Sequence, residues 1–134
     1  MTKIVVQEEP TGCGIACVAM IAGRTYAEVK EIANAQGIYA EDEELFTATK
    51  YVRKLLSDFN VKISEVEQPF SSWEAMPDKA LLATKYRVEN DCARWHWSVY
   101  ISNPVSVLDP AAYLSENIRK DFDHISVKWF ISCE

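Results

Sequence analysis

The chain has 134 residues, of which 49% are hydrophobic and 25% are charged, and this balance predicts one globular domain over residues 1–134. Its net charge of −6 argues against nucleic acid or an anionic membrane as the main partner, since both attract basic surfaces. No segment approaches the ~18 apolar residues of a membrane span, and the first residues do not resemble a secretory signal. We therefore expect a cytoplasmic protein whose four cysteines stay reduced.

The first half of the sequence predicts three helices. Residues 14–22 are small and apolar on all sides, which is typical of a buried helix, and Gly23 ends it. Thr25 is expected to cap a second helix over residues 26–36, which Gly37 ends. A third helix is predicted over about residues 43–59, and its acidic start suits the positive end of a helix dipole.

The second half predicts strands. Residues 61–67 alternate between apolar and polar, as a half-buried strand does. A second strand is predicted over residues 79–86, a loop over 89–92, and a third strand over 95–102, which is rich in aromatic and β-branched residues. Asn103 and Pro104 predict a hairpin turn that brings residues 105–109 back beside 95–102, with paired numbers that sum to about 207.

Three further elements complete the predicted sheet half. One short helical turn is expected within the turn-rich residues 68–78, a short helix around 114–122, and a last strand over 125–132. Because helices precede strands, the predicted fold class is α+β with a mostly antiparallel sheet.

Cys13 and Cys17 are open to several interpretations. A zinc site needs about four ligands in paired short spacings, and Cys13, Cys17 and His96 would supply only three. A redox dithiol normally has two residues between its cysteines, not three. An inert buried role is the common one and suits Cys17, which lies in an apolar run. Cys13 stands between Gly12 and Gly14, which we expect to expose its side chain at a helix start that favours thiolate, and this indicates a nucleophile.

A nucleophilic cysteine needs a general base, and the chain contains two histidines. His96 lies in a predicted strand whose alternation turns it away from the more apolar face, which suits a ring that lines a cleft. A surface or hydrogen-bonded strand histidine is an equally good interpretation of that residue alone. His124 lies beside two aspartates in a predicted loop, where a solvated side chain is favoured.

Asp109 is the candidate that would orient the histidine. The hairpin register places Asp109 near Ser98, about one same-face step from His96 and within reach of its ring. A simple turn-forming role for the Asp-Pro pair is the alternative, and Asn103 is a weaker candidate acceptor.

Gln7 is the candidate oxyanion donor. It lies six residues before Cys13, and the turn at Pro10 would fold it back beside that residue. Its side-chain amide and the Cys13 backbone N–H would then offer two donors to a developing oxyanion.

The order of these residues resembles the C39-like peptidase family of the papain-like cysteine protease superfamily. The resemblance covers residues 3–112 and lies in the motif Gln-x5-Cys-Gly-x-Ala-Cys-x-Ala-Met at 7–20, the strand that starts at His96, and the Asp109-Pro pair. It implies a papain-like fold, in which an N-terminal helical lobe packs on a C-terminal antiparallel sheet with a cleft between them. It also implies Cys13 as nucleophile, His96 as base and then acid, Asp109 as orienter, and Gln7 as oxyanion donor, while Cys17 packs.

Two features depart from the family pattern. Gly12 stands where many relatives have Asp, and the chain has neither the membrane spans nor the phosphate-binding loop of relatives that are fused to transporters. The predicted function is therefore a standalone cysteine hydrolase, acting on a peptide or small amide without a cofactor or metal. The alternatives are an acyltransferase or deamidase that uses the same residues, and a non-catalytic binding or regulatory module on the same fold.

Overall fold

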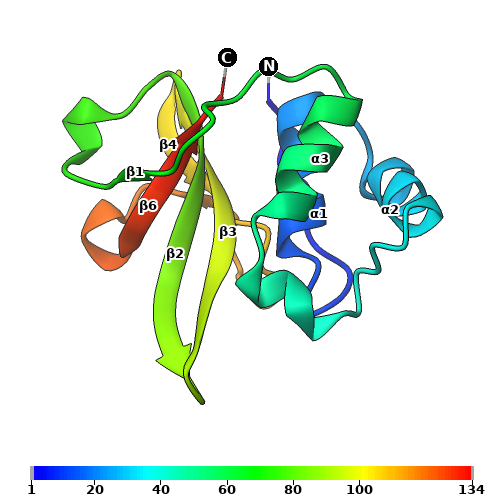
Figure 1. Ribbon diagram of the computed structural model, residues 1–134. Helices are drawn as coiled ribbons and strands as arrows, with labels where there is room; N and C mark the ends of the chain where they lie inside the picture. Colours follow the sequence, from blue (N-terminus) through cyan, green and yellow to red (C-terminus); the bar gives the residue numbers. More distant parts are fainter. Residues whose placement is uncertain (1, 134) are drawn as a thin grey trace.

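The chain folds into a group of helices packed against one antiparallel sheet (Figure 1). The computed structural model describes residues 2–133, without the side chains of residues 46 and 47. Within these residues three α-helices occupy the first part of the chain and a six-stranded sheet the second. The fold class is therefore α+β, as predicted.

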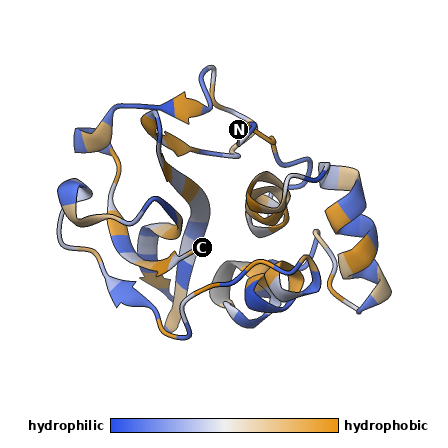
Figure 2. Cartoon of the chain, turned by 90° about the horizontal axis from the view of Figure 1, so that it is seen from above, coloured by the Kyte–Doolittle hydropathy of each residue, from blue (hydrophilic) through white to orange (hydrophobic). Residues whose placement is uncertain are grey.

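Helix α1 (Cys13–Ala22) is the central helix of the molecule. Its small apolar residues are buried along most of its length, and it packs against strand β3 (Cys92–Ser102), α2 (Tyr26–Ala35) and α3 (Lys50–Asp58). Figure 2 shows the two flanking helices alternating between hydrophobic and hydrophilic residues, as helices with one solvated face do. Among residues 2–133, no helix has the length and apolar character needed to cross a membrane.

The predicted signals at the ends of the first two helices are confirmed. Gly23 ends α1 in the left-handed conformation, with φ +70°. The Thr25 hydroxyl accepts the backbone N–H of Glu28, and the Glu28 carboxylate accepts the N–H of Thr25, so a capping box starts α2.

The single helix predicted over residues 43–59 is wrong, because this segment forms two elements. A 3-10 helix, η1 (Glu43–Thr47), begins where the Asp42 carboxylate accepts the N–H of Glu44, and α3 starts only at Lys50. Between them Ala48 is extended, with φ −126° and ψ 143°. This interruption lets η1 pack against β3 while α3 packs against α1, a choice that the helical period of the sequence does not reveal.

The sheet has the strand order β1-β6-β2-β3-β4-β5. Besides β3, its strands are β1 (Gln68–Pro69), β2 (Lys79–Glu89), β4 (Val105–Leu108), β5 (Ile118–Arg119) and β6 (Val127–Ser132). The β3–β4 hairpin pairs Val99 with Leu108 and Ser102 with Val105, which confirms the predicted register.

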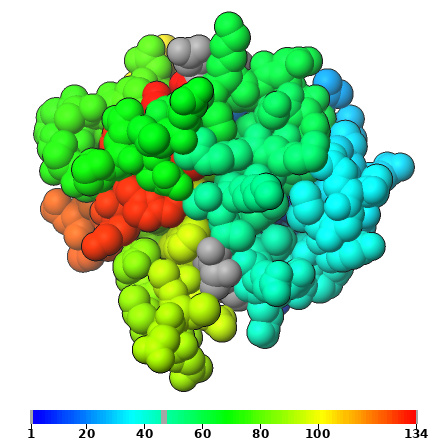
Figure 3. Space-filling view, in the orientation of Figure 1, coloured from blue at the N-terminus to red at the C-terminus, as the bar shows by residue number. Residues whose placement is uncertain are grey.

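Strands β2 and β3 are longer than predicted. The predicted loop at 89–92 is a tight turn in which Asn90 and Asp91 both have positive φ, at 51° and 63°. Two such residues suit the two-residue hairpin turn that follows the twist of the strands. The hairpin therefore continues outward and projects from the body of the molecule (Figure 3).

Two other predicted elements are wrong. Residues 61–67 form no strand: Ile63 makes an isolated bridge to Cys133, and β1 occupies the neighbouring edge of β6. The short helix predicted around 114–122 is replaced by β5 and a 3-10 helix, η3 (Phe122–His124), because this segment pairs with β4. The short turn expected within 68–78 is confirmed as η2 (Trp73–Ala75), and the last strand begins at Val127, not 125.

Two hydrophobic cores lie on the two faces of the sheet. The larger one joins the helices to the face that carries Trp95, Trp97 and Val99 of β3. The smaller one gathers residues such as Tyr100 and Phe130 on the opposite face. Because strand residues alternate between faces, Trp97 enters the main core while the side chain of its neighbour His96 starts from the opposite face of β3.

Candidate active site

Cys13 is the first residue of α1 and lies where the helix meets the sheet. Its N-cap, Gly12, offers no side chain to the first N–H groups of the helix, so the positive end of the helix faces the region of the sulfur. The backbone N–H of Trp97 donates to Cys13 Sγ over 3.5 Å. The sulfur therefore lies near polarised backbone N–H groups from the start of α1 and from β3.

The two glycines beside Cys13 have a different role from the one predicted. They do not expose the cysteine, which is only 1% accessible. A Cβ at Gly12 would lie 2.0 Å from the Tyr26 hydroxyl, and a Cβ at Gly14 would lie 2.0 Å from the Tyr51 hydroxyl. The glycines therefore let two tyrosine rings pack against the backbone on either side of the sulfur.

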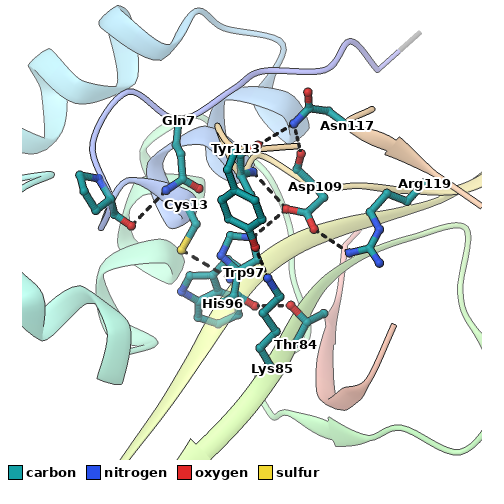
Figure 4. A network of polar contacts seen from close by, with 12 residues as sticks. Gln7, Cys13, Thr84, Lys85, His96, Trp97, Asp109, Tyr113, Asn117 and Arg119 are labelled. Atoms are coloured by element: carbon teal, nitrogen blue, oxygen red, sulfur yellow. Dashed lines mark hydrogen bonds and ion pairs between the residues drawn. The ribbon is translucent and has the colours of Figure 1, made fainter. Parts of the chain in front are cut away.

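His96 lies between Asp109 and Cys13 (Figure 4). Its Nε2 is 2.8 Å from Asp109 Oδ1, which leaves Nδ1 for the cysteine side. Burial alone would lower the pKa of His96, but the Asp109 carboxylate and the Cys13 side chain raise it to about 9. The Thr84 hydroxyl donates to the His96 carbonyl over 2.9 Å and fixes the backbone that carries the ring.

The Asp109 carboxylate is buried and hydrogen-bonded at both oxygens. Oδ1 also accepts the backbone N–H of Ala111 over 3.0 Å, and Oδ2 accepts from Arg119 Nη1 over 3.0 Å. Burial would raise the pKa of Asp109, but the bonds from His96, Ala111 and Arg119 lower it to about 2. Asp109 is therefore an anion at neutral pH.

The turn that follows β4 is tied to two other parts of the chain. Asn117 Nδ2 donates to the carbonyls of Asp109 and Ala111, over 2.8 and 2.9 Å, and the Asn117 carbonyl accepts the N–H of Asp109. The backbone N–H of Gln7 donates to the Pro110 carbonyl over 2.9 Å. The segment before α1 and the segment after β4 are thus held together.

Gln7 is buried on the turn that leads into Cys13. Its Nε2 donates to the carbonyls of Glu9 and Pro10, over 2.9 and 3.0 Å, and the same Glu9 carbonyl accepts the N–H of Gly12. Both amide hydrogens of Gln7 are therefore directed at backbone carbonyls. An oxyanion would have to replace one of these two acceptors.

The other candidates from the sequence lie elsewhere. Cys17 is fully buried in the main core, and burial first and then the neighbouring Cys13 hold the pKa of its thiol well above the ordinary value. Asn103 lies in the exposed turn of the β3–β4 hairpin, and His124 lies exposed in η3.

Sequence reasoning missed Arg119 and Asn117, which contact Asp109. No local motif marks either residue, because only the pairing of β5 with β4 brings them there.

The four cysteines are free thiols, and Cys92 is exposed. In residues 2–133, no three His, Cys, Asp or Glu side chains are grouped as metal ligands would be.

A comparison with curated proteins gave no match. The sequence does match the Peptidase C39 family over residues 1–125, which confirms the resemblance drawn from the motifs. This match includes the helices, the central strands and the segment that carries Arg119. The chain therefore belongs to the Peptidase C39 family and forms a papain-like cysteine peptidase domain.

Proposed function

We propose that the chain is a cysteine hydrolase that cleaves a peptide or small amide bond, with Cys13 as nucleophile and His96 as base and then acid. The observation that carries this proposal is the position of the His96 ring, which contacts the buried Asp109 carboxylate through Nε2 and faces Cys13 with its other side. In the proposed reaction His96 takes the thiol proton, which gives an imidazolium and a thiolate, and its pKa of about 9 favours the protonated ring at neutral pH.

The first half of the proposed reaction forms an acyl-enzyme. The Cys13 thiolate attacks the carbonyl carbon, a C–S bond forms, and the carbonyl π electrons move to oxygen. The backbone N–H of Cys13 and Gln7 Nε2 stabilise this oxyanion, and Gln7 gives up one of its backbone acceptors to do so. When the intermediate collapses, the C–N bond breaks and His96 gives its proton to the departing amine.

The second half releases the acid. Water attacks the thioester carbon while His96 takes a proton from it, and the Cys13 sulfur leaves as thiolate. Asp109 stabilises the imidazolium that forms in each half. A deamidase follows the same route, and an acyltransferase replaces water with another nucleophile.

The burial of Cys13 favours a second candidate, a non-catalytic binding module on the same fold. A thiol that is 1% accessible has to be uncovered before a substrate carbonyl can reach it. In a binding module the cysteine stays covered and the His96–Asp109 pair serves only the fold.

Competitive alkylation tests the two candidates, because the chain carries its own reference thiol. Cys92 is exposed and lies in the hairpin, away from the helices. With iodoacetamide at pH 6, a hydrolase is expected to be modified first at Cys13, since the thiolate is the reactive form. His96→Gln should remove the preference for alkylation at Cys13 over Cys92. In a separate assay, the rate of hydrolysis by Cys13→Ala should be at least about 10³-fold below that of the wild type. Modification of Cys92 first, with Cys13 protected, would support the binding module and contradict the hydrolase.

A further inference from the structure

We propose that Arg119 is a positioning residue of this site, which holds the second oxygen of Asp109 so that the first stays directed at His96. The inference rests on the proposed function, in which Asp109 orients the histidine. It adds a residue that the predicted Cys-His-Asp arrangement does not contain.

The contacts of Arg119 are those of a bridge between two carboxylates. Nη1 lies 3.0 Å from Asp109 Oδ2, while Nε and Nη2 lie 3.0 and 2.8 Å from the two oxygens of Asp121. A planar guanidinium suits this place because its donors point to two sides at fixed angles. Asp121 therefore sets the plane of Arg119, and Arg119 sets the orientation of Asp109.

The pairing of β5 with β4 places the backbone of Arg119 close to Asp109. The two-residue strand β5 pairs Val107 with Arg119 and Leu108 with Ile118, directly before Asp109. Asn117 closes the intervening loop through its three hydrogen bonds to the Asp109 and Ala111 backbone. The loop between β4 and β5 therefore ends close to where it begins, and Arg119 lies beside the Asp109 carboxylate.

The charges along this path alternate in sign. With Cys13 as the thiolate that the proposed function requires, they run through the His96 imidazolium, Asp109 and Arg119 to Asp121 (Figure 4 shows the first four residues). The Asp109 side chain is 2% accessible, that of Arg119 17% and that of Asp121 44%, so the path leads from the core to solvent.

Without Arg119, the three buried groups would carry a net negative charge in a region of low dielectric constant. Lys85 of β2, a second cation in this region, contacts the exposed Tyr113, whereas Arg119 forms the ion pair with Asp109. Arg119 is therefore the cation that balances Asp109.

The test is the titration of His96 by NMR in the full chain, with His124→Gln used to assign the two histidine signals. Arg119→Gln removes the positive charge, so imidazolium is favoured and the pKa of His96 should rise by at least about 0.5. Arg119→Lys keeps the charge and should leave this pKa near the wild-type value. The matched control is Arg87→Gln, which removes an exposed arginine that pairs with Glu89 and should leave His96 unchanged.

The same variants carry a second readout, the rate of Cys13 alkylation. The alkylation rate should fall about tenfold in Arg119→Gln, because Asp109 is no longer held in the orientation that directs His96 toward Cys13. It should recover in part in Arg119→Lys, because lysine restores the positive charge but not the planar set of guanidinium donors. An unchanged His96 titration in Arg119→Gln, or an equal change in Arg87→Gln, would overturn the proposal. If Cys13 of the wild type is not alkylated, the hydrolase proposal fails, while the titration still decides whether Arg119 acts on His96 through Asp109.

If Arg119→Gln does not fold, Asp121→Asn replaces it. This change removes a negative charge at an exposed side chain, so the positive charge of Arg119 is no longer partly neutralised by Asp121. The less compensated cation disfavours imidazolium, so the pKa of His96 should fall. Asp123→Asn, an exposed acid on the same segment, is the control. No difference between these two variants would contradict the positioning role.

Discussion

At the scale of single residues, the site depends on two ionisable groups that hold each other in the charged state. Burial opposes charge on both His96 and Asp109, yet their hydrogen bond reverses this effect and separates their pKa values to about 9 and about 2. Both groups are therefore charged over a wide range around neutral pH. Such a pair links the state of the site to the stability of the fold.

This linkage predicts how stability depends on pH. The pKa of His96 is raised from 6.5, so its contribution to the free energy of unfolding is fully present below pH 6.5 and is lost as the pH rises through about 9. Asp109 has a lowered pKa, so its contribution is present above pH 3.8 and is lost as the pH falls through about 2. Urea unfolding from pH 6 to 9.5 should show wild type losing stability relative to His96→Gln.

The control for this measurement is His124→Gln, which replaces the exposed histidine. A stability difference between wild type and His96→Gln that stays constant from pH 6.5 to 9.5 would contradict the assigned titration.

At the scale of elements, local signals predicted those parts whose ends are set by neighbouring residues. Gly23 and the Thr25 capping box mark helix ends, and the β3–β4 turn sets a register, within a few residues of chain. The failures at 43–59, 61–67 and 114–122 have another cause. In each of these segments, the spacing of apolar residues matches the predicted helix or strand, but packing or pairing with a strand distant in sequence produces a different structure.

The start of α1 gives a prediction at this scale. Gly14→Ala places a methyl group 2.0 Å from the Tyr51 hydroxyl and 2.6 Å from Cζ, so overpacking should destabilise the fold by about 1–3 kcal/mol, although alanine favours helices. Chemical denaturation measures the change. In a Tyr51→Ala background the same substitution should cost little, and an equal cost in both backgrounds would show that the Tyr51 contact is not the cause.

At the scale of the whole molecule, the candidate site lies where the helices meet the sheet. Cys13 starts the central helix, His96 lies on a central strand, and Asp109 follows a strand that ends at that level of the sheet. Because β4 stops at Leu108, the chain beyond it is free to turn toward the start of α1, where Gln7 binds Pro110. Because the helices and the sheet both contribute residues to this site, we propose that residues 1–134 form one domain.

The distribution of tryptophans allows that proposal to be tested. All four tryptophans lie at position 73 or later, in the sheet half, whereas the three α-helices end by Asp58. Tryptophan fluorescence therefore reports mainly on the sheet, and circular dichroism at 222 nm mainly on the helices. In one cooperative domain the two urea transitions should coincide. Distinct midpoints would mean that the helices and the sheet unfold separately.

The sequence by itself determined the fold class, the ends of the first two helices, the central hairpin and the family motifs around Cys13, His96 and Asp109. These depend on residue types and short spacings, which act through local hydrogen bonds and side-chain periodicity. Only the tertiary structure decided that Cys13 is buried, that tyrosines cover Gly12 and Gly14, and that Arg119 binds Asp109. Those contacts join segments far apart in the chain, and their positions follow from how the helices and strands pack, which no local pattern encodes.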